Sequence, residues 1–103
     1  MLDKTIVKQI AESYTNRVRA EYSPKQVILF GSYIHDSMHE DSDIDIAVIF
    51  DVTPGDFLDT WKHLLKLRRG VSFDIETHLL DETMNRCGFL DHIRNTGEVI
   101  FEA

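Results

Sequence analysis

The segment 43–50, DIDIAVIF, constrains the fold of this chain more than any other feature. Successive side chains of an extended strand point to opposite faces, so Asp43 and Asp45 share one face and the aliphatic residues that alternate with them share the other. Such alternation is typical of a strand with one face in a core. Two carboxylates this close repel each other unless a cation or a proton lies between them. The segment therefore predicts a strand that carries both a core face and a charged site.

Helical and extended segments alternate along the rest of the chain. Besides the strand over 43–50, the pattern predicts helices over 3–22, 56–69 and 81–95, and strands over 27–30, 71–77 and 99–101. Asp56 or Asp59 is the expected N-cap of the second helix. The alternation indicates an α/β (α+β) protein, a small mixed β-sheet with helices packed against it. No linker, repeat or low-complexity tract divides the chain, so we expect residues 1–103 to form a single domain.

The charge balance and the cysteine content exclude several classes of protein. Eighteen acidic against eleven basic residues give a formal net charge of −7, which argues against direct nucleic-acid binding, because such affinity comes from neutralising phosphates. No apolar run is long enough to span a membrane. The single cysteine, Cys87, cannot form an internal disulfide, so we expect a cytoplasmic protein. A nucleotide ligand is compatible with this charge, because a divalent cation can invert it locally.

Acidic residues are concentrated around the charged strand. Eight of them, and no Lys or Arg, lie between Asp36 and Asp59. A bound Mg²⁺ is the simplest compensation, because this hard ion takes oxygen ligands and keeps coordination positions for phosphates. If the strand over 71–77 pairs with the strand over 43–50, Asp74 can approach the two aspartates there, and three carboxylates would suit a two-metal site. Glu76, on the face of Asp74, is interpreted as structural or solvated.

The pair Gly31-Ser32 directly follows the apolar strand over 27–30. Glycine at this place lets a phosphate approach the backbone, and Ser32 adds a hydroxyl and an N–H group. Gly31 and Ser32 are therefore candidate nucleotide-binding residues, with an ordinary strand-ending turn as the alternative. A zinc site over 35–39, which imitates a helical His-x-x-x-His motif, is disfavoured because the segment lacks helical periodicity and a third ligand.

Gly31-Ser32, ten intervening residues and Asp43-x-Asp45 form the signature GS-x10-D-x-D, and on it the chain resembles the DNA polymerase β-like nucleotidyltransferase superfamily. The short length and the segments LFGS and SDIDIAV are similar to its minimal branch, the MNT antitoxin-like proteins. The resemblance implies a nucleotidyltransferase fold in which Asp43, Asp45 and Asp74 are catalytic and bind the metal. It also implies that Gly31 and Ser32 hold the nucleotide phosphates.

The same resemblance implies a function. Members of the family transfer a nucleoside monophosphate from a triphosphate to a hydroxyl with Mg²⁺, and for this chain AMP from ATP to a protein hydroxyl is the expected reaction. Minimal members are often antitoxins paired with HEPN toxins, so a HEPN-type toxin protein is the implied partner. Asp74 is the candidate general base, or metal-assisted activator, of the acceptor hydroxyl. Whether the protein works as a homo- or hetero-oligomer is left open.

The chain departs from its relatives after the Gly-Ser pair. Many relatives have an arginine and a glycine there, whereas this chain reads Tyr33-Ile34-His35-Asp36, which removes a phosphate contact and adds a negative charge. The departure predicts weaker triphosphate binding, which leaves room for the first of two alternatives; the second is independent of it. One is an inactive binding module that neutralises its partner by occlusion. The other is a small-molecule nucleotidyltransferase of the aminoglycoside type, which needs a second domain or an oligomer to build its acceptor pocket.

Overall fold

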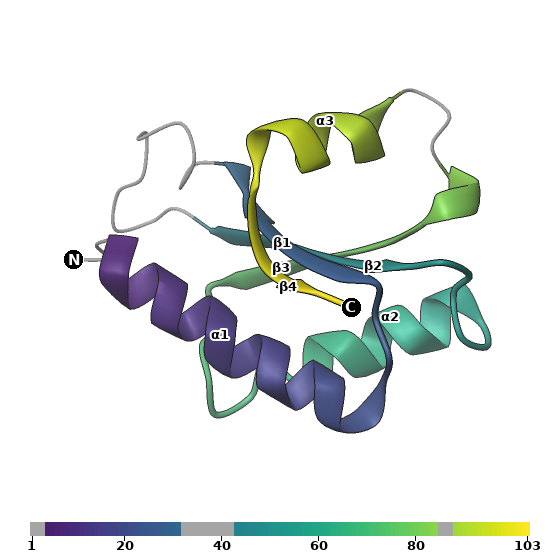
Figure 1. Ribbon diagram of the computed structural model, residues 1–103. Helices are drawn as coiled ribbons and strands as arrows, with labels where there is room; N and C mark the ends of the chain where they lie inside the picture. The colour runs from purple at the N-terminus through teal and green to yellow at the C-terminus, as the bar shows by residue number, and fades with distance from the viewer. Residues whose placement is uncertain (1–3, 32–42, 85–87) are drawn as a thin grey trace.

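Four strands form one mixed sheet that separates two layers of helices. The computed structural model describes residues 4–31, 43–84 and 88–103. The elements follow in the order α1 (Lys4–Glu21), β1 (Gln26–Phe30), β2 (Ile44–Phe50), α2 (Phe57–Lys66), β3 (Ile75–Asp81), the short 3-10 helix η2 (Glu82–Met84), α3 (Phe89–Thr96) and β4 (Glu98–Glu102). Helices α1 and α2 cover one face of the sheet and α3 lies on the other (Figure 1). The expected mixed sheet with helices packed against it is confirmed.

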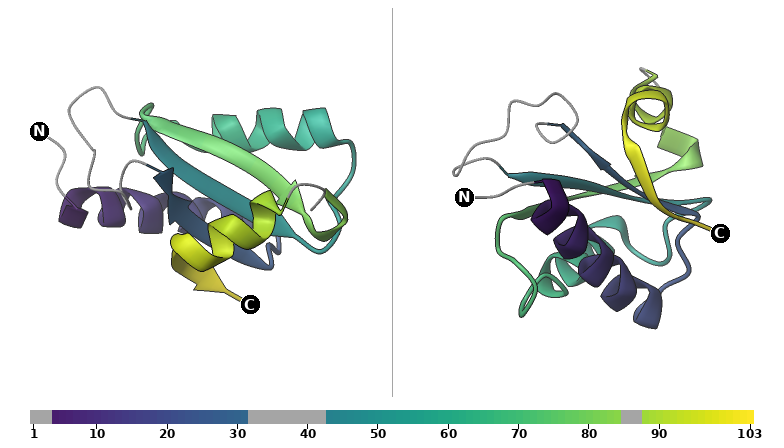
Figure 2. Two further views of the ribbon diagram at one scale, coloured as in Figure 1. Left: turned by 90° about the horizontal axis from the view of Figure 1, so that it is seen from above. Right: turned by 60° about the vertical axis from the view of Figure 1, so that its left-hand side comes forward.

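The strands are ordered β3-β2-β1-β4, with β1 and β2 in the middle (Figure 2, left). Strand β1 runs antiparallel to both of its neighbours, whereas β2 and β3 are parallel and are joined by the crossover helix α2. Ile44 is the register partner of Ile75, and Asp45 is the partner of Glu76. The second and third strands therefore pair, which is the condition for Asp74 to approach the two aspartates, and the beginnings of β2 and β3 lie side by side.

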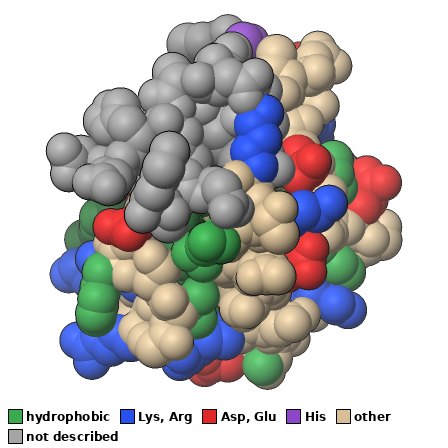
Figure 3. Space-filling model, turned by 90° about the vertical axis from the view of Figure 1, so that its left-hand side faces the viewer, with side chains coloured by type: hydrophobic (Ala, Val, Ile, Leu, Met, Phe, Trp, Pro, Cys, Tyr) green, Lys and Arg blue, Asp and Glu red, His purple; other side chains and the backbone are tan. Residues whose placement is uncertain are grey.

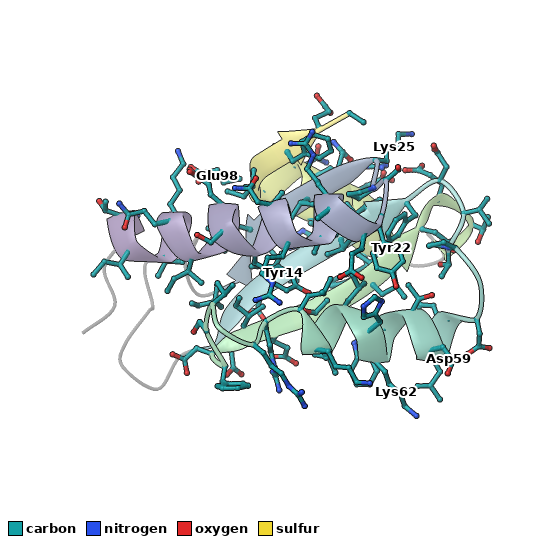
Figure 4. All side chains as sticks on the ribbon, turned by 90° about the horizontal axis from the view of Figure 1, so that it is seen from below. Tyr14, Tyr22, Lys25, Asp59, Lys62 and Glu98 are labelled. Atoms are coloured by element: carbon teal, nitrogen blue, oxygen red, sulfur yellow. The ribbon has the colours of Figure 1, made fainter. Side chains whose placement is uncertain are left out.

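The face of the sheet toward α1 and α2 holds the larger apolar cluster. Alternate residues of β2, beginning with Ile44, are fully buried there against α1 and α2. Tyr14 of α1 points into the space between the two helices and the sheet (Figure 4). Its hydroxyl donates to the Leu64 carbonyl at 2.7 Å and lies 2.8 Å from Thr77 Oγ1, and burial raises the pKa of Tyr14 to about 12.

The face of the sheet toward α3 holds a smaller cluster, built on Ile28, Ala47, Ile49, Leu90 and Ile93. Helix α3 is only eight residues long, and the buried members of this cluster on the sheet are Ile28 of β1 and Ala47 and Ile49 of β2. At the end of β1 the partly buried Phe30 packs against the cluster, with its ring centroid 6.2 Å from that of Phe89. At the beginnings of β2 and β3 the same face carries polar side chains. The fold thus leaves one part of a strand face available for chemistry.

The third strand lies four residues later than the sequence predicts, at 75–81 instead of 71–77. Val71 and Ser72 donate backbone hydrogen bonds to the Arg68 carbonyl, so this segment continues the turn after α2 rather than pairing with β2. The helix expected over 81–95 is shorter than predicted because β3 extends to residue 81. Asp81 ends β3 instead of starting a helix, and α3 begins at Phe89.

Asp81 stabilises the far end of β3. Its side chain accepts hydrogen bonds from the backbone N–H and the hydroxyl of both Thr53 and Thr83. Burial raises the pKa of Asp81, but these hydrogen bonds outweigh it and hold the pKa below its ordinary value of 3.8. The carboxylate is thus balanced entirely by protein donors.

Strand β3 is the outermost strand beside α2. The Ile44 N–H donates to the Asp74 carbonyl at 2.8 Å, so the backbone groups of Ile75 and Thr77 face away from β2. Trp61 Nε1 donates to the Thr77 carbonyl at 3.1 Å, and Arg68 Nη1 donates to the Ile75 carbonyl at 3.0 Å. Within the described ranges, no helix is long and apolar enough to cross a membrane.

Candidate active site

The candidate site lies where β1 ends and where β2 and β3 begin. Gly31 directly follows β1, and Asp45 is the second residue of β2. The register places Asp45 opposite Phe30 of β1 on one side and opposite Glu76 of β3 on the other. Phe30, Asp45 and Glu76 share the sheet face toward α3. Each lies an even number of residues from a member of the apolar cluster beneath α3, namely Ile28, Ala47 and Leu80 in turn.

Three side chains come together at this end of the sheet. One carboxylate oxygen from Asp45, one from Glu76 and one ring nitrogen of His78 lie within 4.8 Å of one another. His78 Nε2 is 3.2 Å from Asp45 Oδ1; both of these side chains are partly buried, whereas Glu76 is exposed. Two carboxylates and an imidazole are ordinary ligands of divalent cations in proteins. The arrangement can therefore hold a metal ion.

Gly31 and Asp45 are in contact, which joins the two halves of the sequence signature. Gly31 has a φ of +78°, and a Cβ atom built on it would overlap Asp45 Oδ2 and lie 3.0 Å from Asp45 Cγ. Any other residue would therefore force the carboxylate to move, in addition to its own backbone strain. The role of Gly31 in phosphate binding stays a prediction. Ser32, the second candidate for that role, lies outside the described residues.

Asp43 and Asp74 occupy equivalent places, each directly before its strand. The Ile44 N–H donates to the Asp74 carbonyl, which sets the two strand beginnings next to each other. Both aspartates are exposed, and neither belongs to the ligand group of Asp45. Of the three predicted carboxylates, the structure thus brings Asp45 together with Glu76 and His78. The predicted metal-binding and catalytic roles of Asp43, Asp45 and Asp74 stay predictions.

Sequence reasoning missed His78 and assigned Glu76 no role at the site. The signal was present in the spacing Asp74-x-Glu76-x-His78, which puts three polar side chains on one face of any strand that contains them. The strand was expected to end at residue 77, however, which left His78 in a connection. Extending the strand to Asp81 restores the pattern.

A groove runs beside the site along the outer edge of β3. Its volume is about 740 Å³, within the range of small-molecule sites, and it lies between α2 and β3. Asp43 and Glu76 line it together with Trp61, Arg68 and Phe73. On the end of the molecule that carries the site, the described acidic and basic side chains are interspersed rather than gathered by sign (Figure 3).

Comparisons with known proteins agree with this fold. A family model described as "Polymerase beta, Nucleotidyltransferase" matches residues 8–103. The "Putative protein adenylyltransferase MJ1215" of Methanocaldococcus jannaschii is 38% identical over 48 residues, which are 47% of this chain and 56% of the relative. The chain thus spans about half the length of the curated relatives it matches.

Two solved structures share the architecture. A "putative nucleotidyltransferase" from Sulfolobus solfataricus matches with a TM-score of 0.70 at 18% identity, over 96% of this chain and 83% of that chain. A chain of the complex between a tri-AMPylated Shewanella oneidensis HEPN toxin and an MNT antitoxin matches with a TM-score of 0.64 at 21% identity, over 93% of this chain and 73% of that chain. The expected nucleotidyltransferase fold is confirmed.

Proposed function

Because this chain belongs to the polymerase beta nucleotidyltransferase family, we propose that it transfers AMP from ATP to a hydroxyl group of a partner protein. The contact between Gly31 and Asp45 carries the proposal, because it joins a candidate phosphate-binding turn to a candidate metal ligand at one end of the sheet. The similarity to proteins named protein adenylyltransferases supports a protein as the acceptor. The AMPylated toxin in the Shewanella complex supports a HEPN-type toxin as that partner.

The residues at this end of the sheet fit a divalent cation. Asp45 offers a carboxylate beside a second carboxylate and an imidazole, and only a glycine at position 31 leaves room for it. Asp43, Asp45 and Asp74 would hold Mg²⁺, which when bound supplies positive charge to the triphosphate and to the leaving pyrophosphate. The backbone of Gly31 would approach the phosphates. Asp74 would accept the proton of the acceptor hydroxyl.

A second candidate function is an inactive module that neutralises its partner by occlusion. The replacement of the usual arginine and glycine by Tyr33-Ile34-His35-Asp36 favours it, because this change weakens the expected phosphate contacts. Exposed apolar side chains beside the groove favour it as well. Phe73 is 70% exposed and Leu58 is 51% exposed, and both line the groove next to Asp43.

A transfer assay distinguishes the two functions. The protein is incubated with α-³²P-labelled ATP, Mg²⁺ and the protein encoded by the neighbouring gene, and label on that partner is measured. We expect label with the wild type and a loss of at least about a thousandfold in the double variant Asp43→Asn with Asp45→Asn, because both are proposed metal ligands. The control double variant Asp51→Asn with Asp59→Asn removes the same charge outside the site and should keep the activity.

The outcomes separate the candidates as follows. Full labelling by the variant that lacks Asp43 and Asp45 would refute the metal assignment. No labelling by the wild type, together with tight binding and inhibition of the partner, would replace the enzyme with the occluding module.

A further inference from the structure

Asp45 is held between two groups that use its two oxygens differently. Its Oδ1 lies 3.2 Å from His78 Nε2, and its Oδ2 faces the backbone of Gly31. Phe30, the register partner of Asp45, packs its ring edge-on against the imidazole of His78, with the ring centroids 5.0 Å apart. The aromatic contact holds the imidazole in place beside the carboxylate. His78 is therefore positioned by neighbours on two strands.

A second histidine–carboxylate pair in the chain provides a comparison. His63 Nε2 lies 3.2 Å from Glu21 Oε1, the same separation as in the His78 pair. The other ring nitrogen of His63 is engaged by the Tyr22 hydroxyl at 2.6 Å, and no second carboxylate joins that pair in a ligand group within the described ranges. The His78 pair differs because Glu76 brings a second carboxylate oxygen within 4.8 Å of both partners. Three converging ligand atoms can hold a metal ion, whereas the His63 pair offers only two.

We propose that His78 is a nitrogen ligand of the metal ion at Asp45, with Glu76 as a further oxygen ligand, and that this set makes the site prefer a first-row transition cation such as Mn²⁺ over Mg²⁺. Mg²⁺ takes oxygen ligands almost exclusively, whereas an imidazole nitrogen raises the affinity for first-row transition cations. Mn²⁺ is the weakest binder of that series and accepts carboxylate ligands as Mg²⁺ does, so it is the most demanding probe of a preference that comes from the nitrogen. The inference rests on the proposed function only for the presence of a cation at this end of the sheet. The identity of the cation follows from the side chains that surround Asp45.

The test measures metal binding directly, with the metal-free full chain and Mn²⁺ as the probe. Electron paramagnetic resonance counts free Mn²⁺, and Mg²⁺ competition gives the ratio of the two affinities. Electron spin echo modulation of bound Mn²⁺ detects a coordinated imidazole nitrogen in the wild type without any substitution. We expect that nitrogen signal, and we expect His78→Gln to abolish it and to weaken Mn²⁺ binding about tenfold or more. Mg²⁺ binding should change by less than about threefold, since it gains little from imidazole.

The control is His63→Gln, which makes the same chemical change in the other histidine–carboxylate pair and should leave Mn²⁺ binding and the nitrogen signal unchanged. Absence of the nitrogen signal from wild-type protein, absence of Mn²⁺ binding, or an unchanged Mn²⁺ to Mg²⁺ ratio in His78→Gln would each overturn the proposal. Binding of Mn²⁺ through His78 without AMP transfer would uphold it and refute the proposed function instead. AMP transfer without the nitrogen signal would uphold the proposed function and overturn the assignment of His78 as a metal ligand.

Discussion

The two faces of the sheet use the same strands for opposite purposes. Toward α1 and α2, alternate residues of β2 are apolar along the whole strand and are buried, and the hydroxyl of Tyr14 is hydrogen-bonded to Leu64 and Thr77. Toward α3, β2 is aliphatic only in its second half and begins with Asp45. One continuous core on a single face thus stabilises the sheet sufficiently for the other face to carry charges at one end.

Of the substitutions that affect one face of the sheet and not the other, Gly31→Ala should have the largest effect. It changes only the face toward α3. The new Cβ would overlap the carboxylate of Asp45, so we expect metal affinity and AMP transfer to fall about a hundredfold. Gly88→Ala is the matched control, because Gly88 also has a positive φ of +71°, but among the described residues no atom beyond its chain neighbours lies within 4 Å of the added Cβ. Metal titration of both variants checks the prediction. An equal loss in both would attribute the effect to backbone strain rather than to Asp45.

The second prediction compares two carboxylates at opposite ends of the paired strands β2 and β3, Asp45 and Asp81. Asp45 lies in a group that can bind a cation, whereas Asp81 is balanced by donors from Thr53 and Thr83. Asp81→Asn places an amide donor against those donors, so we expect the free energy of unfolding to fall by about 2 kcal/mol with metal binding unchanged. Urea unfolding measures the loss. Asp51→Asn, which breaks an exposed ion pair with Lys25, should cost less than about 0.5 kcal/mol.

The same carboxylate predicts a pH dependence. Because the pKa of Asp81 is held below 3.8 in the folded state, its contribution to stability is complete above that value and is lost as the pH falls through the folded-state pKa. The free energy of unfolding of the wild type should therefore fall more steeply with decreasing pH than that of Asp81→Asn. Parallel acid profiles for the two proteins would contradict this assignment.

The smallest effect should come from Tyr14→Phe, which changes only the face toward α1 and α2. Loss of the hydroxyl removes its bonds to Leu64 and Thr77 and should cost about 1 kcal/mol near neutral pH. The raised pKa, about 12, means that the contribution of Tyr14 is fully present below pH 10 and is lost as the pH rises toward 12. Above pH 10 the free energy of unfolding should therefore fall less steeply with pH in Tyr14→Phe than in the wild type, by up to about 1.4 kcal/mol per pH unit. Identical alkaline slopes would disprove the role of Tyr14.

The sequence predicts the elements best where local pattern and tertiary contact agree. The alternation in DIDIAVIF identifies β2 within one residue, and Asp56 is the N-cap of α2, as one of the two expected candidates. The sequence pattern misplaces β3, because apolar and polar residues alternate both in VSFDIET and in IETHLLD. Only the pairing with β2 determines that the strand is formed by the second of these segments. The shift of four residues is even, so Glu76 keeps its face although the strand boundaries change. The nitrogen ligand could not be found without that boundary.

The hydrogen bonds from Trp61 and Arg68 to β3 determine how the sheet ends. A strand from another molecule that approached this margin would find the acceptors of Thr77 and Ile75 already occupied by an indole and a guanidinium. It would have to displace both before it could extend the ladder, which is a recognised safeguard against edge-to-edge polymerisation. A protein that docks on this side of the molecule would therefore have to recognise the side chains of the groove, and would gain nothing from imitating a fifth strand.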